Sequence, residues 1–103
     1  MPVGDPGRVA YMYILECSDR SLYVGSTRNL DRRLWEHSEG LGSAYTRSRL
    51  PVRLLYFERY DRVEAAFARE KQVQGWSRAK RLALVKETPE KLRPLSRKPP
   101  RTA

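Results

Sequence analysis

The chain of 103 residues has the size of one domain, so we expect a single core and no second catalytic domain. Lysine and arginine number 21 against 12 aspartate and glutamate residues, and the resulting net charge of +9 points to a polyanion, nucleic acid first, as the partner. Hydrophobic residues make up 40% and aromatic residues 10% of the chain, which excludes a wholly disordered basic protein.

The cysteine and histidine content limits the metal chemistry. One cysteine, Cys17, excludes an intrachain disulfide, and with His37 as the one histidine there are too few ligands for a Cys/His zinc site.

The first eight residues hold no apolar run typical of a signal peptide, and the longest apolar stretch, 9–15, is far shorter than a membrane span. We therefore expect a cytoplasmic protein that has no contact with a membrane.

The two ends of the chain differ in composition from its middle. Residues 1–8 hold two prolines and two glycines, and residues 88–103 hold four prolines with five basic residues against one glutamate. This composition predicts a flexible end at 1–8, a folded domain at 9–87, and a basic, proline-rich flexible tail at 88–103. The tail is either a solvated extension or an additional contact to phosphates.

The folded part begins with a predicted hairpin. Residues 9–16 carry β-forming side chains on both alternate faces, which predicts a strand that is covered on both sides. Turn-forming residues follow at 18–20, and residues 21–25 are predicted to run back as the partner strand.

The length of the hairpin loop decides which side chains share a face. A three-residue loop would pair Tyr13 with Gly25 and Leu15 with Tyr23, so that both tyrosines lie on one face of the sheet. A four-residue loop would place the two tyrosines on opposite faces. Either tyrosine alone also fits ordinary strand packing.

The remaining elements alternate between helix and strand. Capping residues, apolar periodicity and the positions of glycine and proline set their bounds. We predict a helix over 30–39, a strand over 52–60, a helix over 62–75 that ends at glycine, and a basic helix over 78–86. The order ββαβαα predicts a small α+β domain in which a three-stranded, mostly antiparallel sheet is flanked by helices.

One carboxylate falls within an apolar stripe of the helix predicted over 62–75. At about 100° per residue, the stripe contains Val63, Ala66, Phe67, Glu70 and Gln74. Because burial of an unpaired carboxylate is costly, Glu70 should be ion-paired, protonated, bound to a cation, or at the open rim of the stripe. A structural ion pair and a metal-binding or catalytic carboxylate both remain open.

The first predicted helix also carries polar groups on its apolar side. Arg33 and His37 lie one turn apart on the side that carries Leu30, Leu34 and Leu41. Separately, an arginine can extend over an apolar patch and a histidine can be a satisfied packing residue. Together with the carboxylate on the later helix, they predict a pocket with a cation, an imidazole and an acid, a set that suits phosphodiester chemistry.

Four motifs follow one another along the chain: YMY at 11–13, YVG at 23–25, STRNLDRRLWEH at 26–37, and then Glu70. In this order they resemble the GIY-YIG nuclease superfamily, although YMY replaces GIY and valine replaces the isoleucine of YIG. The segments AYTRSRLPVRLLYFE at 44–58 and EKQVQGWSRAKRLALV at 70–85 are similar to the short, stand-alone, YhbQ-like branch of bacterial proteins. The resemblance extends over about residues 9–87.

The resemblance implies a metal-dependent endonuclease that hydrolyses DNA phosphodiester bonds, structure-directed or weakly sequence-specific, in repair or recombination. One divalent cation, Mg²⁺ or Mn²⁺, would be held by Glu70 and the scissile phosphate. Tyr13 would act as general base or orient the attacking water, and Tyr23 would position the phosphate or the water. Arg33 would neutralise the developing charge, and His37 would assist proton transfer. Gly25 and Asn29 match structural positions of the motifs, the latter as a helix cap.

Further basic residues lie in predicted loops or on polar helix faces, where they are able to track a phosphate backbone or simply remain solvated. They are Arg28, Arg32, Arg47, Arg49, Arg78, Lys80 and Arg81. Tyr45 and Trp76 either stack on bases or pack within the protein. No helix is typical of base reading, so we expect low sequence specificity.

Two other functions fit parts of this pattern. A non-catalytic nucleic-acid-binding module would keep the fold and the basic surface without cleavage. A small RNA- or ribosome-associated protein fits the charge, which makes RNA a second possible partner, but it leaves the ordered motifs unexplained. Many members of the superfamily join this module to a DNA-binding domain, so affinity here would come either from the chain's own charge or from a separate protein partner that supplies targeting.

Overall fold

The structure, a computed structural model, describes residues 9–87. Its elements are β1 (Ala10–Glu16), β2 (Leu22–Thr27), α1 (Leu30–Ser38), α2 (Ala44–Arg47), β3 (Arg53–Tyr60), α3 (Val63–Gln74) and α4 (Arg78–Glu87). The predicted α+β class and the order ββαβαα are confirmed, with α2 as one additional turn of helix. The predicted flexible ends at 1–8 and 88–103 lie outside the described residues.

The sheet is antiparallel throughout, with the strand order β2-β1-β3. Its first hairpin pairs Tyr13 with Gly25 and Leu15 with Tyr23, which is the register expected for the shorter loop. Both tyrosines therefore lie on the same face of the sheet, because paired residues of antiparallel strands point the same way.

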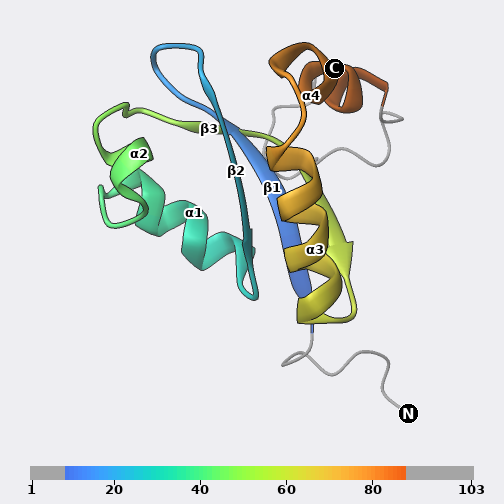
Figure 1. Cartoon of the computed structure of the whole chain (residues 1–103). Coiled ribbons are helices and arrows are strands. Elements are labelled where there is room, and N and C mark those ends of the chain that lie inside the picture. Colours follow the sequence, from blue (N-terminus) through green and yellow to red (C-terminus); the bar gives the residue numbers. More distant parts are fainter. Residues whose placement is uncertain (1–8, 88–103) are drawn as a thin grey trace, which may run out of the picture.

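The central strand β1 is covered on both faces, which explains its continuous apolar sequence. Figure 1 shows α1 and α2 beside one face of the sheet and α3 and α4 beside the other. Met12 and Ile14 pack with Val73 on the α3 side. Tyr13 packs with Leu30 on the α1 side. Two small cores thus share one strand.

Capping side chains fix where the two helices on the first face begin. Asn29 is the N-cap of α1, and its side chain accepts a hydrogen bond of 3.0 Å from the backbone N–H of Arg32. Ser43 caps α2 in the same way, accepting from the backbone N–H of Thr46 at 3.2 Å. A helix of four residues is too short to give a periodic pattern, so the sequence did not predict α2.

Three apolar residues of the predicted buried stripes are exposed. Val63 and Phe67 of α3 are 40% and 52% exposed, because this helix packs through Ala66 and Val73 instead. Leu41 is 61% exposed. Since α1 ends at Ser38 and the chain turns at Gly40 with φ +79°, the helical period does not continue to this leucine.

The helices are too short to span a bilayer. The longest, α3, has 12 residues, and within residues 9–87 no helix has the length and apolar content that a membrane span requires.

A polar network joins β3 to α3. Glu58 accepts hydrogen bonds from the hydroxyl groups of Tyr56 and Tyr60, and from Nε and Nη2 of Arg69 at 2.9 and 3.1 Å. Burial raises the pKa of Glu58, but the hydrogen bonds from Arg69, Tyr56 and Tyr60 outweigh it, so the pKa lies below its ordinary value. The carboxylate therefore remains ionised and holds the helix against the edge strand.

We expect Glu58→Gln to lower the free energy of unfolding by about 1 to 3 kcal/mol, because it leaves the half-buried Arg69 without its counter-charge. Urea unfolding followed by tryptophan fluorescence measures this loss. Asp61→Asn is the matched control, since its ion pair with Arg59 is exposed, and it should change stability by less than about 0.5 kcal/mol. Equal unfolding midpoints for Glu58→Gln and the parent would contradict a stabilising role.

Candidate active site

Four of the predicted site residues meet on the α1 face of the sheet. Tyr13 comes from β1, Tyr23 from β2, and Arg33 and His37 from α1. The Tyr13 hydroxyl lies 2.9 Å from His37 Nε2, and the nearby Arg33 guanidinium acts to lower the pKa of this phenol. The rings of Tyr23 and His37 lie edge to face with centroids 5.3 Å apart. The hairpin and the first helix therefore assemble one cluster.

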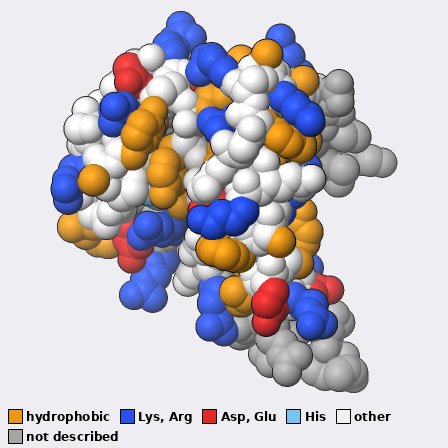
Figure 2. All heavy atoms as spheres, viewed as in Figure 1, with side chains coloured by type: hydrophobic (Ala, Val, Ile, Leu, Met, Phe, Trp, Pro, Cys, Tyr) orange, Lys and Arg blue, Asp and Glu red, His pale blue; other side chains and the backbone are white. Residues whose placement is uncertain are grey.

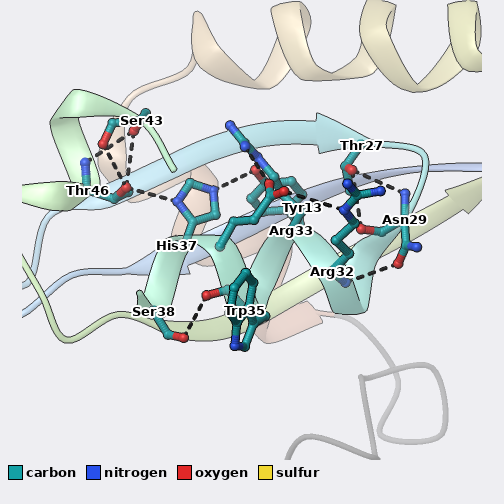
Figure 3. Close-up of polar contacts among 11 residues, drawn as sticks. Tyr13, Thr27, Asn29, Arg32, Arg33, Trp35, His37, Ser38, Ser43 and Thr46 are labelled. Atoms are coloured by element: carbon teal, nitrogen blue, oxygen red, sulfur yellow. Dashed lines mark hydrogen bonds and ion pairs between the residues drawn. The ribbon is translucent and has the colours of Figure 1, made fainter. Parts of the chain in front are cut away.

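A chain of hydrogen bonds fixes the protonation of the imidazole (Figure 3). The Thr46 hydroxyl donates to the Ser43 carbonyl at 3.2 Å, so its oxygen accepts from His37 Nδ1 at 2.9 Å. We therefore assign the ring proton to Nδ1. The unprotonated Nε2 then accepts the proton of the Tyr13 hydroxyl.

Burial keeps both members of this pair neutral at pH 7. Burial, assisted by the positive charge of Arg33, lowers the pKa of His37 to about 4. Burial also raises the pKa of Tyr13 to about 12, and the hydrogen bond from Arg33 only partly opposes it. A neutral phenol thus faces a neutral imidazole, whose Nε2 accepts its hydrogen bond.

Two glycines make room for these side chains. A Cβ atom on Gly25 would lie 2.5 Å from the Tyr13 hydroxyl oxygen, and one on Gly42 would lie 2.2 Å from His37 Nδ1. Both distances are far below van der Waals contact. The glycine of the YVG motif is thus needed so that the phenol can lie against β2.

Neighbouring side chains hold the cluster in place. Glu36 binds the half-buried Arg33 at 2.8 Å between Oε1 and Nη1. Tyr45 stacks on Tyr23 with ring centroids 6.0 Å apart, and the Arg49 guanidinium covers the Tyr45 ring at 3.8 Å. Tyr45 is therefore engaged in packing within the protein.

Glu70 approaches from the other side of the sheet. It lies on α3 and accepts hydrogen bonds from Ser26 Oγ at 2.6 Å and from Gln74 Nε2 at 2.8 Å. Ser26 is next to Gly25, the residue that the Tyr13 phenol touches. Among residues 9–87, Glu70 makes no ion pair, so the structural ion pair considered for it is not formed.

The five predicted residues consequently do not surround one cleft on a single face. The α1 face carries Tyr13, Tyr23, Arg33 and His37. Glu70 reaches the edge strand β2 from the α3 face, where it binds Ser26. Next to the main effect of burial, the negative charge of Glu70 adds to the raised pKa of Tyr13. The two parts of the site therefore interact electrostatically across β2.

The donor set near Glu70 restricts which metal it is able to hold. Residues 9–87 contain no group of three or more His, Cys, Asp or Glu side chains arranged for a metal ion. Each oxygen of Glu70 accepts one hydrogen bond, which leaves lone pairs on both. Mg²⁺ commonly takes one or two carboxylates and completes its shell with waters and substrate phosphates. The single carboxylate of Glu70, beside the edge strand β2, fits that ion, and no dedicated protein cage is present within residues 9–87.

The predicted phosphate-contacting residues fall into two groups. Arg28, Arg32, Arg47 and Arg49 belong to the α1 and α2 side, whereas Arg78, Lys80 and Arg81 belong to α4 on the other side of the sheet (Figure 1). On the face shown in Figure 2, basic side chains are spread out and do not form one stripe.

Side chains in and just before α4 stabilise the fold. Arg81 donates to the carbonyls of Val73 and Gln74 at 3.1 and 2.7 Å, which satisfies the end of α3. Trp76 packs against the core of this side, with Lys80 4.3 Å from its ring centroid. The basic side chains of the α1 and α2 side lie on the same side of the sheet as the cluster around Tyr13.

Sequence reasoning missed five residues that support the site. Two of them had a signal, because Glu36 follows Arg33 by three positions and Gln74 follows Glu70 by four, spacings that join side chains on a helix. The other three residues are Ser26, Gly42 and Thr46. Ser26 binds a residue of a distant helix, and Gly42 and Thr46 contact His37 from outside its helix, so no periodic pattern indicates these contacts.

Comparison with known proteins shows the family to which the chain belongs. The sequence model of the GIY-YIG catalytic domain matches residues 9–83, and the chain belongs to this family of nuclease domains. It is 47% identical over 83 residues to a UPF0213 protein of Syntrophus aciditrophicus, a match that covers 80% of this chain and 95% of that protein. It is 56% identical over 61 residues to a UPF0213 protein of Streptococcus pyogenes serotype M5, covering 59% and 66% of the two chains.

A solved structure supports the same assignment. The solution NMR structure of a UPF0213 protein from Bacillus halodurans is 42% identical and superimposes with a TM-score of 0.51, covering 76% of this chain and 83% of that one. The resemblance to the GIY-YIG superfamily and to its short branch is thus confirmed.

We expect Gly42→Ala to lower the free energy of unfolding by about 1 to 3 kcal/mol, because the added methyl group displaces the His37 ring. Urea denaturation measures the loss. Gly75→Ala is the control: its Cβ would lie 3.5 Å from the Gln72 carbonyl oxygen, an ordinary contact distance, so stability should change by less than about 0.5 kcal/mol. Equal stability of both variants would show that the imidazole is not held against residue 42.

Protein stability should fall in mild acid because of His37. Between its ordinary pKa of 6.5 and its folded pKa of about 4, the unfolded chain binds a proton that the folded chain does not. From pH 7 to pH 5, the free energy of unfolding should therefore drop by about 2 kcal/mol. Urea denaturation at both pH values measures the drop, and His37→Gln should lose most of this pH dependence. A pH dependence unchanged in His37→Gln would contradict the buried neutral imidazole.

Proposed function

We propose that the protein is a metal-dependent endonuclease that hydrolyses DNA phosphodiester bonds. The observation that carries the proposal is the buried hydrogen bond from the Tyr13 phenol to His37 Nε2, with Arg33 at the same oxygen. Membership of the GIY-YIG catalytic domain family supports it, since that family is one of nucleases.

The Tyr13 and His37 pair orients the attacking water. A phenol whose pKa is about 12 is a poor acid, and a buried imidazole whose pKa is about 4 is a poor base at pH 7. The Tyr13 hydroxyl therefore keeps its hydrogen bond to His37 Nε2, and its oxygen accepts a hydrogen bond from the attacking water. The water oxygen forms the new bond to phosphorus as the bond from phosphorus to the sugar oxygen breaks, and the proton that the water loses passes through solvent to the leaving oxygen. Thr46 holds the imidazole in the tautomer that the hydrogen bond from Tyr13 requires.

Arg33 and Tyr23 act on the phosphate. Glu36 fixes the Arg33 guanidinium, which places a permanent positive charge beside the phenol, where the pentacoordinate phosphorus gains negative charge. Tyr23 is half-buried, whereas Tyr13 is only 1% exposed, so Tyr23 is the tyrosine that meets the phosphate first. Tyr23 positions the substrate, and Tyr13 acts on the water.

Glu70 would hold one divalent cation, Mg²⁺ or Mn²⁺, together with the scissile phosphate. When bound, this ion neutralises charge on the phosphate oxygens and on the leaving group. Ser26 and Gln74 orient the carboxylate by one hydrogen bond to each oxygen. Gln74 also donates to the Val24 carbonyl at 3.1 Å, so the carboxylate is tied to the edge strand β2.

The substrate should be recognised by shape and charge more than by base sequence. The basic side chains on the α1 and α2 side contact phosphates, and no described helix presents a row of base-reading side chains. This pattern suits a structure-directed or weakly specific nuclease of DNA repair or recombination in the cytoplasm, delivered to its substrate by a protein partner. RNA binding and a non-catalytic role on the same fold are the alternatives that the following experiment decides.

Cleavage of end-labelled single-stranded, duplex and branched DNA, with Mg²⁺ or Mn²⁺ and with EDTA, tests the proposal. The parent protein should give products only with the metal. Arg33→Ala should lower the rate about 100- to 1,000-fold, as loss of a charge-stabilising donor does. Glu70→Ala and Tyr13→Phe should abolish most cleavage while DNA binding largely survives.

Glu64→Ala provides the matched control, because this glutamate lies in the first turn of the same helix as Glu70 and is exposed. It should cleave like the parent. If Glu70→Ala, Arg33→Ala and Tyr13→Phe all cleave like Glu64→Ala, the assigned site is wrong. If folded parent protein binds DNA but yields no products with either metal, the binding module becomes the better description.

A further inference from the structure

We propose that a pocket beside the candidate active site binds one unpaired nucleotide of the DNA strand, with its base against Tyr11 and Phe57 and its phosphate between Arg28 and Arg59. This inference rests on the proposed function, because it names the substrate class of the same site. The pocket has a volume of about 360 Å³, and small-molecule pockets are roughly 300 to 1,000 Å³. It is therefore large enough for a single nucleotide and too small for a base pair.

The pocket follows directly from the register of the sheet. Tyr11 and Tyr13 are two residues apart on β1 and point to the same face, so they are separated by about 7 Å along the strand. Phe57 pairs with Tyr13, and Arg59 pairs with Tyr11. The pocket thus begins one row of side chains away from the phenol.

The aromatic walls provide a surface for a base. The rings of Tyr11 and Phe57 meet edge to face, with centroids 5.9 Å apart and an interplanar angle of 78°. Both side chains are only partly buried, and both line the pocket. A ring in this position offers a face or an edge to any base, which gives affinity without sequence reading.

The rim of the pocket carries the charge that a phosphate requires. Arg59 comes from β3, and Arg28 comes from the loop between β2 and α1. Asn29 and Asp31 line the same opening, so the charged lining consists of two guanidinium groups and one carboxylate. The arginines favour the phosphate, and the carboxylate disfavours a second anion. One nucleotide satisfies both conditions better than a free polyphosphate.

Another pocket among the described residues lacks this combination. It has a volume of about 250 Å³ and lies near Cys17, Arg20 and Arg53, and it contains no aromatic side chain. Arg53 is nevertheless an exposed arginine of the same strand as Arg59. It therefore supplies a matched control for charge alone.

A base inside a duplex is stacked and paired and is not able to enter the pocket without leaving the helix. The protein should thus bind single-stranded DNA, or DNA with an unpaired nucleotide next to the scissile phosphate, more tightly than a continuous duplex. This preference distinguishes a nucleotide pocket from a merely basic surface, which would favour the higher charge density of the duplex.

Fluorescence anisotropy with a labelled 12-nucleotide single strand and with the same strand in a duplex, both in EDTA, tests the pocket without cleavage. We expect at least about five-fold tighter binding of the single strand. Tyr11→Ala should weaken single-strand binding about 5- to 150-fold and remove the preference. Tyr11→Phe keeps the ring and should retain both.

Arg59→Gln tests the phosphate contact. The slope of log K against log salt for the single strand should become shallower by about 0.7, the value for one phosphate contact, while Arg53→Gln leaves it unchanged. Both arginines are largely exposed, so neither change should affect folding. Equal slopes for the two variants would remove the phosphate contact from the proposal.

Backbone amide NMR shifts of the parent protein on addition of the single strand separate this inference from the nuclease proposal. Shifts at Tyr11, Phe57 and Arg59 support the pocket. Shifts only near Tyr23 and Arg33, or no shifts at all, overturn it. The nuclease proposal is decided independently by the cleavage assay with Mg²⁺ and Mn²⁺.

Discussion

The hydrogen bond between Tyr13 and His37 connects the central strand to the first helix inside the apolar interior, and the local structure is arranged around it. Both side chains are almost completely buried, at 1% and 0% exposure. A buried polar group is costly unless each of its donors and acceptors is satisfied. Thr46 satisfies the second nitrogen of His37, and the Tyr13 hydroxyl satisfies the first. The absence of Cβ atoms at Gly25 and Gly42 makes this close approach possible.

This constraint also explains the role of the short helix α2. Its cap, Ser43, supplies the carbonyl that receives the Thr46 proton, and this in turn directs the Thr46 oxygen toward His37. The segment that the sequence marked only as a loop is thus the element that fixes the imidazole tautomer. The helical turn brings the Thr46 hydroxyl next to the Ser43 carbonyl, because residues three apart in a helix lie on the same side.

The two faces of the sheet carry different groups of polar side chains. The α1 face holds the tyrosines, the arginine and the histidine, and the α3 face holds Glu70 and the Glu58 network. The edge strand β2 is where the two faces meet, because Gly25 contacts Tyr13 and the next residue, Ser26, binds Glu70. In the proposed function, a substrate phosphate at this edge would reach both sets of side chains. The arrangement thus allows charge from both sides of a thin sheet to act on one group.

The sequence by itself determined the α+β class, the order of the main elements and the motifs that mark the family. It did so because strand and helix periodicity, the Asn29 cap and the hairpin turn are local signals that survive in the folded chain. It also named Tyr13 and His37 as site residues, but not their direct contact.

Only the tertiary structure decided on which face each side chain lies. The α3 helix packs through Ala66 and Val73, which exposes Phe67 and leaves Glu70 at the rim beside Ser26. The partners Thr46 and Ser26 and the pocket between Tyr11 and Arg59 join residues from different elements. Helix rotation and strand pairing depend on how whole surfaces fit together, and no local pattern encodes that fit.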